Sequence, residues 1–290
     1  MRIRLSVVIT AVLLAGFAIA PSVGHASPAK AKPKIKVLVL GDSVGQGLAT
    51  KALQFDERLD VVNAATVNCT LTGGALESYA DGIVIGQGCE DWRTAWPPLV
   101  QQNQPDIVLV WTGGWEIVDR WFGDSAGVGL PSTILDPAFQ QQLSNAQTEA
   151  ATLLSTGGAK VAFTTMQYIN PPHAYPEPPG VNGISEIWWE PYGPDAPPPG
   201  YEAPLPGQPF VGSKTKVDAL NKIRLDQAAQ GAITVFNLQK LVSPKGVFTD
   251  KLKGKPARDV DSSHFNEYGY KQITKWLVPQ LQKLANSKRS

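Results

Sequence analysis

Continuous apolar runs constrain this chain more than any other feature of its sequence. The segment Val37–Leu40 reads "VLVL", and four later segments resemble it. These are Leu59–Ala64, Asp106–Thr112, Ala159–Thr165 and Ala232–Asn237. Uninterrupted runs rich in β-branched residues are typical of parallel strands that are buried on both faces. We therefore expect a parallel sheet of about five strands.

Segments with helical character separate these runs. They are Val44–Phe55, Phe139–Ser155, Lys214–Ala229 and Glu267–Ala285. In Lys214–Ala229 the expected apolar residues are Val217, Leu220, Ile223 and Leu225. Alternating strands and helices predict an α/β fold, a three-layer αβα sandwich. No internal repeat appears, so we expect a single domain over residues 35–290.

Composition narrows the class of protein. The chain has 290 residues, of which 43% are hydrophobic and 18% charged, and this balance is typical of a globular core. The net charge of +1 and the lack of a basic block give no electrostatic basis for binding nucleic acid. We therefore expect no nucleic-acid partner.

The N-terminus has the features of an export signal. Arg2 and Arg4 precede the apolar stretch Leu5–Ala20, and small residues lead up to Ala26. This pattern predicts a signal peptide over residues 1–26, cleaved after Ala26, and a flexible leader over residues 27–34. An uncleaved membrane anchor is the alternative, although the apolar stretch is short for a span. The protein is expected to be secreted or to remain in the cell envelope.

A long proline-rich segment interrupts the alternation from about residue 170 to about residue 212. It contains aromatic residues that include Trp188 and Trp189. Long loops inside a domain are often functional, and this one follows the end of a predicted strand, where α/β sheets bind ligands. We consider two interpretations, a substrate-covering insertion and a surface excursion held down by its aromatic residues.

Two cysteines, Cys69 and Cys89, are the only ones in the chain. In an oxidising compartment such a pair usually forms a disulfide, which for this loop length is worth about 3 kcal/mol by the loop-entropy model. Two buried free thiols are the alternative. No set of Cys, His and carboxylate residues has the spacing of metal ligands, so we predict neither a metal nor another cofactor.

Two short motifs carry candidate chemistry. Gly41-Asp42-Ser43 follows the first strand, and Asp261 and His264 lie three residues apart near the C-terminus. A serine hydroxyl needs a base to accept its proton, and a histidine base needs a carboxylate to orient it. Taken singly, each motif could be only a turn and a helix cap.

Together, these motifs resemble those of the SGNH (GDSL-type) hydrolase superfamily. That superfamily has a Gly-Asp-Ser block after its first strand and an Asp-x-x-His block near its C-terminus. The resemblance extends from Val37 to about Leu281 and implies a flavodoxin-like parallel sheet. It also implies Ser43 as nucleophile, His264 as base and Asp261 as the orienting carboxylate.

The two middle blocks of the superfamily match less well. Asn68 stands where a glycine is expected to direct a backbone N–H toward the oxyanion. The third block, usually Gly-x-Asn-Asp, reads Gly113-Gly114-Trp115-Glu116, so it has no side-chain amide. Loss of one oxyanion donor can lower the rate about 10²–10³-fold. The resemblance therefore implies a hole built from the N–H groups of Ser43, Asn68 and Gly113, or else weak catalysis.

These departures resemble SGNH domains that are associated with bacterial envelope acyltransferases, in which Trp-Glu in the third block is usual. The cysteine pair and Arg258 also fit that group. Arg258 could bind a substrate carboxylate or support the turn before Asp261. Trp115 and Glu116 could contact substrate or, together with Asp119 and Arg120, form an internal packing and ion-pair cluster. Asp42 is expected to stabilise the turn, and a substrate contact is the alternative.

We therefore predict an exported serine esterase or O-acyltransferase that acts on acyl esters of envelope carbohydrate or lipid through an acyl-Ser43 intermediate. Acetyl or another short chain is the expected acyl group. One alternative is a weak or inactive glycan-binding protein that uses Trp188 or Trp189. The other is an accessory partner of a membrane acyltransferase.

Overall fold

Five parallel strands form the central sheet of this computed structural model. The structure describes residues 33–73, 75–78, 82–85, 89, 91–122, 132–169, 214–259 and 261–287. The sheet order is β2-β1-β5-β7-β8. The strands are β1 (Ile35–Gly41), β2 (Leu59–Asn63), β5 (Ile107–Trp111), β7 (Lys160–Thr164) and β8 (Thr234–Phe236). Counted along the chain, this is the order 2-1-3-4-5 of a flavodoxin-like sheet, so the expected fold class is confirmed.

Side chains of the central strands are buried on both faces of the sheet. Along β1, Val37 and Val39 belong to one hydrophobic cluster, whereas Leu38 and Leu40 belong to another. This alternation follows from the two-residue period of a strand. The apolar run therefore supplies two cores at once.

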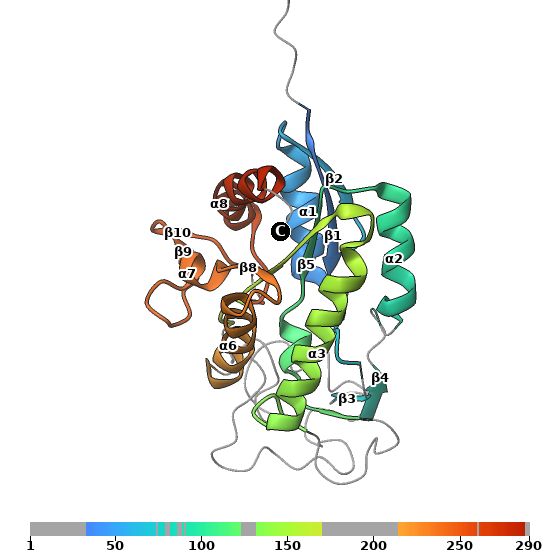
Figure 1. Cartoon of the computed structure of the whole chain (residues 1–290). Coiled ribbons are helices and arrows are strands. Elements are labelled where there is room, and N and C mark those ends of the chain that lie inside the picture. Colours follow the sequence, from blue (N-terminus) through green and yellow to red (C-terminus); the bar gives the residue numbers. More distant parts are fainter. Residues whose placement is uncertain are drawn as a thin grey trace, which may run out of the picture. The chain divides into compact units, whose positions relative to one another are not determined.

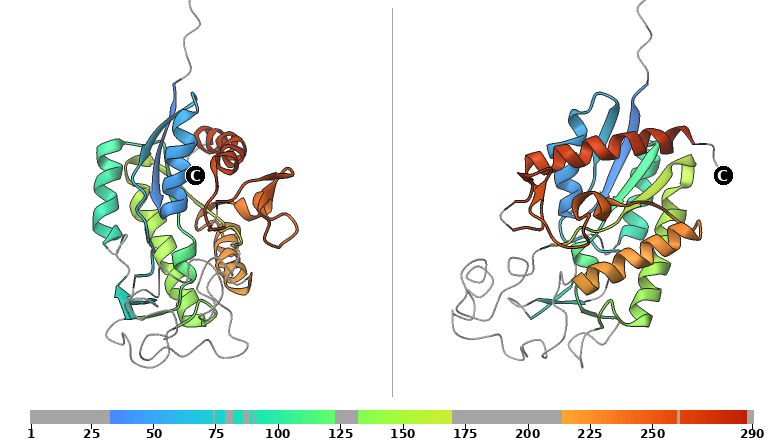
Figure 2. Two further views of the ribbon diagram at one scale, coloured as in Figure 1. Left: turned by 180° about the vertical axis from the view of Figure 1, so that it is seen from behind. Right: turned by 90° about the vertical axis from the view of Figure 1, so that its left-hand side faces the viewer.

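Helices cover the two faces of the sheet. They are α1 (Ser43–Lys51), α2 (Trp92–Asn103), α3 (Pro137–Leu154), α6 (Lys214–Ala229), α7 (Leu238–Val242) and α8 (Glu267–Asn286). Figure 1 shows α1 and α8 on one side of the sheet and α2 and α3 on the other, and the two hydrophobic clusters divide in the same way. The views in Figure 2 show the same layers. The sandwich is thus three-layered, as expected.

Short elements complete the described chain. The 3-10 turns are η1 (Leu53–Phe55), η2 (Gly114–Ile117) and η4 (Thr156–Gly158). The small strands are β3 (Ala75–Ser78), β4 (Gly82–Ile85), β6 (Arg120–Trp121), β9 (Lys251–Leu252) and β10 (Lys255–Pro256). They form one three-stranded and one two-stranded sheet. In the part of the chain described here, no helix has both the length and the apolar character needed to cross a membrane.

Helix α2 is an element that the sequence pattern did not predict. Pro97 and Pro98 lie inside it, and each proline lacks the N–H of a helical hydrogen bond. Trp92, Trp96 and Val100 are nevertheless buried at four-residue intervals along one side of this helix. Packing of this apolar stripe against the sheet outweighs the helix-breaking tendency of the prolines.

Helix α6 has the expected bounds but a different inward face. Of its apolar residues, Val217 and Leu220 are buried, whereas Leu225 is 37% exposed. Polar side chains share the inward face with the two apolar ones. They are Lys216, Asn221, Arg224 and Gln227. Hydrogen bonds inside the fold allow these polar groups to take buried positions, while Leu225 lies on the outer side of the helix.

Candidate active site

Ser43 lies at the turn between β1 and α1. The turn requires glycine at position 41, where φ is 122° and a Cβ would lie 1.9 Å from the carbonyl oxygen of Trp111. The Asp42 backbone N–H donates to that same Trp111 oxygen at 2.8 Å. Ser43 then begins α1 at the switch point between β1 and β5, where open α/β sheets bind ligands.

Asp42 caps this helix. Its carboxylate accepts a hydrogen bond from the Val44 N–H at 3.0 Å, and its side chain is buried. Burial raises the pKa of Asp42 to about 6, although the capping N–H groups oppose this shift. These contacts correspond to the turn-stabilising role that was expected.

The Asp261 carboxylate organises the turn before α8. Its Oδ1 accepts from the backbone N–H of Ser263 at 3.0 Å and of His264 at 2.9 Å. Its Oδ2 is hydrogen-bonded to Nδ1 of the His264 ring. Asn266 caps α8 by accepting from the Gly269 N–H at 3.0 Å. The short spacing of Asp261 and His264 thus lets one carboxylate hold both the backbone and the ring.

The other ring nitrogen of His264 meets the serine. The His264 Nε2 lies 2.7 Å from the Ser43 Oγ, although 221 positions separate the two residues in the chain. With its proton on Nδ1, facing Asp261, the ring presents the Nε2 lone pair to the hydroxyl. The three side chains thus form a continuous hydrogen-bonded Ser-His-Asp arrangement.

His264 and Asp261 shift each other's pKa. The hydrogen bond to Asp261 raises the pKa of His264, and burial opposes it only partly. Burial alone would raise the pKa of Asp261, but its hydrogen bonds with His264 outweigh burial and lower it. Asp261 is therefore ionised at neutral pH and able to stabilise a protonated His264.

The loop after β2 brings Asn68 toward the end of β1. The Thr66 N–H donates to the Gly41 carbonyl oxygen at 2.8 Å, so this loop continues alongside the serine turn. Asn68 has a φ of 60°, in the left-handed region that favours glycine. Asparagine adopts this conformation more readily than most residues with a side chain. Asn68 thus has a backbone conformation that glycine would also take.

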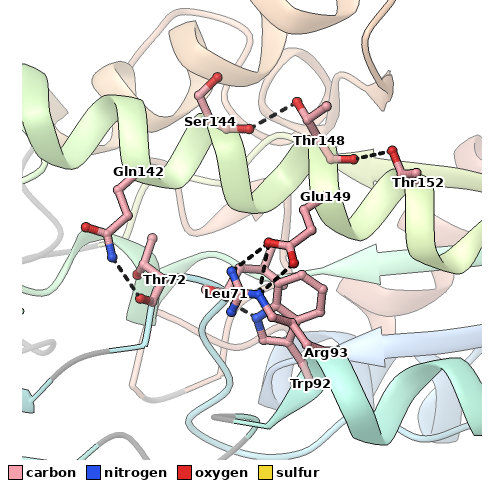
Figure 3. Close-up of polar contacts among 9 residues, drawn as sticks. All are labelled: Leu71, Thr72, Trp92, Arg93, Gln142, Ser144, Thr148, Glu149 and Thr152. Atoms are coloured by element: carbon pink, nitrogen blue, oxygen red, sulfur yellow. Dashed lines mark hydrogen bonds and ion pairs between the residues drawn. The ribbon is translucent and has the colours of Figure 1, made fainter. Parts of the chain in front are cut away.

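A disulfide anchors the same loop. Cys69 and Cys89 are joined, with their Cα atoms 5.0 Å apart, as the sequence predicted. Two further contacts hold the carbonyl groups beyond Cys69 from the helix side (Figure 3): the Trp92 Nε1 donates to Leu71 at 3.0 Å and the Gln142 Nε2 to Thr72 at 3.3 Å. Contacts from two helices therefore restrain the segment that follows Asn68.

Glu116 lies inside the protein. Its side chain is fully buried, and its carboxylate accepts from the Thr70 hydroxyl and the Leu71 N–H, each at 2.8 Å. Arg120 donates to the hydroxyls of Thr70 and Thr72 and to the Gly73 carbonyl. These contacts place Glu116 and Arg120 in an internal cluster, as considered from the sequence, whereas Asp119 forms its ion pair with Lys216 of α6. Glu116 touches the Asn68 loop and has no exposed surface for substrate.

Gly113 and Trp115 follow β5. Within the described residues, no acceptor bonds the backbone N–H of Ser43, Asn68 or Gly113. Trp115 is half-buried, and its carbonyl oxygen accepts from the Arg120 guanidinium. In the described part of the chain, the three N–H groups named from the resemblance are therefore not used by protein acceptors.

Arg258 supports the turn that carries Asp261 and His264. It is 8% exposed, donates to the Tyr168 carbonyl at 3.1 Å, and lies with its guanidinium carbon 3.9 Å from the centre of the Phe265 ring. Burial lowers the pKa of Arg258 to about 9. Of the two roles weighed from the sequence, these contacts fit support of the turn.

Helix α6 supplies residues that sequence reasoning missed. Lys216 forms an ion pair with Asp119 at 2.7 Å, and Asn221 bonds both the N–H and the carbonyl of Met166. Arg224 reaches the ends of β5 and β7. One signal was present: Arg224 follows Val217 by seven positions and Leu220 by four, which places it on the buried stripe. The predicted ligands Trp188 and Trp189 lie outside the described residues.

Comparisons with known proteins give similarity of structure only. No family model matches the chain, and no curated protein matches it. A GDSL-like lipase from Bacteroides thetaiotaomicron is similar, with 12% identity, 86% of this chain and 88% of that chain covered, and a TM-score of 0.49. A carbohydrate esterase family 3 protein from Talaromyces cellulolyticus is also similar, with 13% identity and a TM-score of 0.47; 88% of this chain and 100% of that chain are covered.

A third similar structure is the periplasmic domain of a lipopolysaccharide acetyltransferase from Salmonella ser. Paratyphi A. It has 10% identity, 86% of this chain and 84% of that chain are covered, and the TM-score is 0.47. At such identities and TM-scores, the activity of this chain has to be inferred from its own side chains.

Proposed function

We propose that the protein is a serine esterase or O-acyltransferase of the SGNH type. The observation that carries the proposal is the 2.7 Å contact between Ser43 Oγ and His264 Nε2, with Asp261 bonded to the other ring nitrogen. A surface serine has no need of an oriented base, whereas a nucleophilic serine does. Ser43, His264 and Asp261 are therefore assigned as nucleophile, general base and orienting carboxylate.

The reaction proceeds in two halves. Ser43 Oγ attacks the carbonyl carbon of an ester, and His264 Nε2 accepts the hydroxyl proton. The tetrahedral intermediate collapses, the bond to the alcohol oxygen breaks, and His264 returns the proton to the departing alcohol. Water or a sugar hydroxyl then gives its proton to His264 and attacks the carbonyl carbon of acyl-Ser43. The bond between that carbon and the Ser43 Oγ breaks, His264 returns the proton to Oγ, and an acid or a new ester is released.

The N–H groups of Ser43, Asn68 and Gly113 are the proposed oxyanion donors. Charge on the carbonyl oxygen is largest in the tetrahedral state, so donors aimed at that oxygen lower the barrier selectively. The N–H of Ser43 is also a first-turn group of α1, where the helix dipole favours negative charge. These three N–H groups would together take the place of a side-chain amide.

The substrate proposal is an acyl ester, acetyl or short-chain, of an envelope carbohydrate or lipid. It rests on the sequence pattern of an export signal and on the resemblance to acyltransferase-associated domains. The Cys69–Cys89 disulfide supports an oxidising, extracytoplasmic compartment. N-terminal sequencing of the exported protein tests this part: a chain that begins at Ser27 supports cleavage, and one that begins at Met1 supports an anchor.

A fluorophosphonate probe on the purified protein tests the chemistry. We expect labelling that mass spectrometry assigns to Ser43 and that disappears in the Ser43→Ala and His264→Ala variants. Ester hydrolysis and acyl transfer to an added sugar are then measured on unlabelled protein. Both rates are divided by the fraction of protein that the probe labels. A folded wild-type protein that neither labels nor releases acid from p-nitrophenyl acetate would overturn the proposal and favour the glycan-binding alternative.

A further inference from the structure

Arg224 is a fully buried cation beside the proposed site. Its Nη1 donates to the carbonyl oxygens of Thr112 at 2.9 Å and Thr164 at 2.7 Å, and its Nη2 donates to the Thr112 hydroxyl at 2.7 Å. No carboxylate of the described residues lies within ion-pair distance of it. These hydrogen bonds of the guanidinium are therefore all made with the strand ends that face the site.

Burial of such a charge needs an explanation. Desolvation lowers the pKa of Arg224 to about 10, and the more distant charges of Glu116 and Asp42 only partly offset it. Burial of a charge without an ion-pair partner costs free energy, which in this protein the hydrogen bonds to Thr112 and Thr164 offset.

The contact with Thr112 determines the direction of a neighbouring N–H. The Thr112 carbonyl and the Gly113 N–H belong to one peptide group, which is planar and trans, so they point in opposite directions. A guanidinium bound to the carbonyl therefore restricts the orientation of the Gly113 N–H. Because hydrogen bonds polarise one another through an amide, it also strengthens that N–H as a donor.

Helix α6 also restrains Met166, the residue that packs against Gly113. A Cβ at Gly113 would lie 3.2 Å from the Met166 Cγ, and Asn221 holds the Met166 backbone at both its N–H and its carbonyl. Asn221 and Arg224 are one helical turn apart on α6. Two side chains of one helix thus restrain both the peptide before Gly113 and the residue packed against it.

We propose that Arg224 is a positioning residue for the oxyanion hole: by binding the Thr112 carbonyl it orients and polarises the Thr112–Gly113 peptide, so that the Gly113 N–H takes the share of the missing side-chain amide. This inference rests on the proposed function. Arg224 itself does not touch the substrate and acts only through that peptide.

The test compares Arg224→Met and Arg224→Lys with wild type, using kcat per active site titrated by the fluorophosphonate probe. For Arg224→Met we expect kcat to fall about 10- to 100-fold, which is no more than the effect of removing a whole oxyanion donor. KM should change by less than about twofold. Arg224→Lys keeps one donor for Thr112 and should recover part of this loss. Affinity for a boronic acid, which becomes a tetrahedral anion on Ser43, should fall in parallel.

Gln227→Met on the same helix is the matched control. Gln227 is also buried and donates to the Ser144 carbonyl and the Thr148 hydroxyl, away from the site. It should lose stability without losing kcat per titrated site. Unchanged kcat and boronate affinity in both folded Arg224 variants would overturn the inference. If Arg224→Met does not fold, the same comparison is made with Arg224→Lys alone. A folded wild-type protein that neither labels at Ser43 nor releases acid from p-nitrophenyl acetate would instead overturn the proposed function.

Discussion

The carboxylate of Glu116 accepts a hydrogen bond from the Leu71 backbone N–H at 2.8 Å, so the loop after β5 directly holds the loop after β2. The two proposed donors Asn68 and Gly113 come from these two loops. Their relative position therefore depends on a buried side chain that does not reach the solvent. Rigid support of this kind keeps donors in place before the reaction begins.

Glu116→Gln should weaken both stability and catalysis. An amide can accept at only one of its two terminal atoms, so one buried donor of Thr70 or Leu71 would lose its acceptor. We expect a loss of about 1–3 kcal/mol in unfolding free energy, measured in urea, and a lower kcat at unchanged active-site titre. Glu149→Gln, which removes an exposed ion pair with Arg93, should cost less than about 1 kcal/mol and leave kcat alone.

Asp261→Asn should lower kcat about 10³–10⁴-fold with little change in fold, because the amide no longer stabilises the protonated ring and permits the wrong tautomer. Stopped-flow acylation with p-nitrophenyl acetate measures this change. A variant with wild-type acylation rates would show that Asp261 has no orienting role.

The pH dependence follows from the shifted groups. Ser43 is activated only by neutral His264, whose pKa lies above its usual 6.5, so kcat/KM should rise with pH through a value above 6.5. In Asp261→Asn the midpoint should move to lower pH, because the main cause of the rise is gone. A pH–rate profile from pH 5 to 9 checks both midpoints.

The free energy of unfolding should depend on pH through His264 and Asp261, in opposite directions. His264 has a raised pKa in the folded state, so its contribution is complete below about 6.5 and disappears as pH rises through the folded value. Asp261 has a lowered pKa, so its contribution is present above about 3.8 and disappears as pH falls through the folded value. The contribution of His264 is measured from the urea midpoints of wild type and His264→Gln over a range of pH. Parallel curves for the two proteins would show that His264 does not contribute to the pH dependence of stability.

Asn68 should tolerate glycine but not a β-branched residue. The proposed donor is its backbone N–H, and its φ of 60° is open to glycine. Asn68→Gly should therefore keep kcat within about threefold, whereas Asn68→Val should cost about 1–2 kcal/mol and lower kcat further. If Asn68→Gly lost activity as fully as Asn68→Val, the side chain would be the functional group.

Loss of the disulfide should cost stability and activity together. The bond closes a loop of 20 residues, and its removal by Cys69→Ser with Cys89→Ser should lower unfolding free energy by about 3 kcal/mol. Because Asn68 directly precedes Cys69, kcat should also fall. Wild type with and without dithiothreitol is the control, and an unchanged kcat would show that the other contacts of this loop suffice.

Local patterns in the sequence were enough to predict the sheet, most of the helices and the two motifs that carry Ser43, Asp261 and His264. An apolar run such as Val37–Leu40 puts hydrophobic side chains on both faces of a strand, so it predicts a strand of a parallel sheet with both faces covered. The Asp261–His264 contact is also local, because three residues of a tight turn bring the two side chains together.

Only the tertiary structure decided the long-range support of the site. Burial of Glu116 and Arg224 costs free energy, and only acceptors and donors supplied by distant segments offset it, such as Leu71 for one and Thr112 for the other. Helix α2 likewise forms despite Pro97 and Pro98 because the sheet receives its tryptophans. A linear sequence does not reveal these partners, since each depends on which strand ends the completed sheet brings side by side.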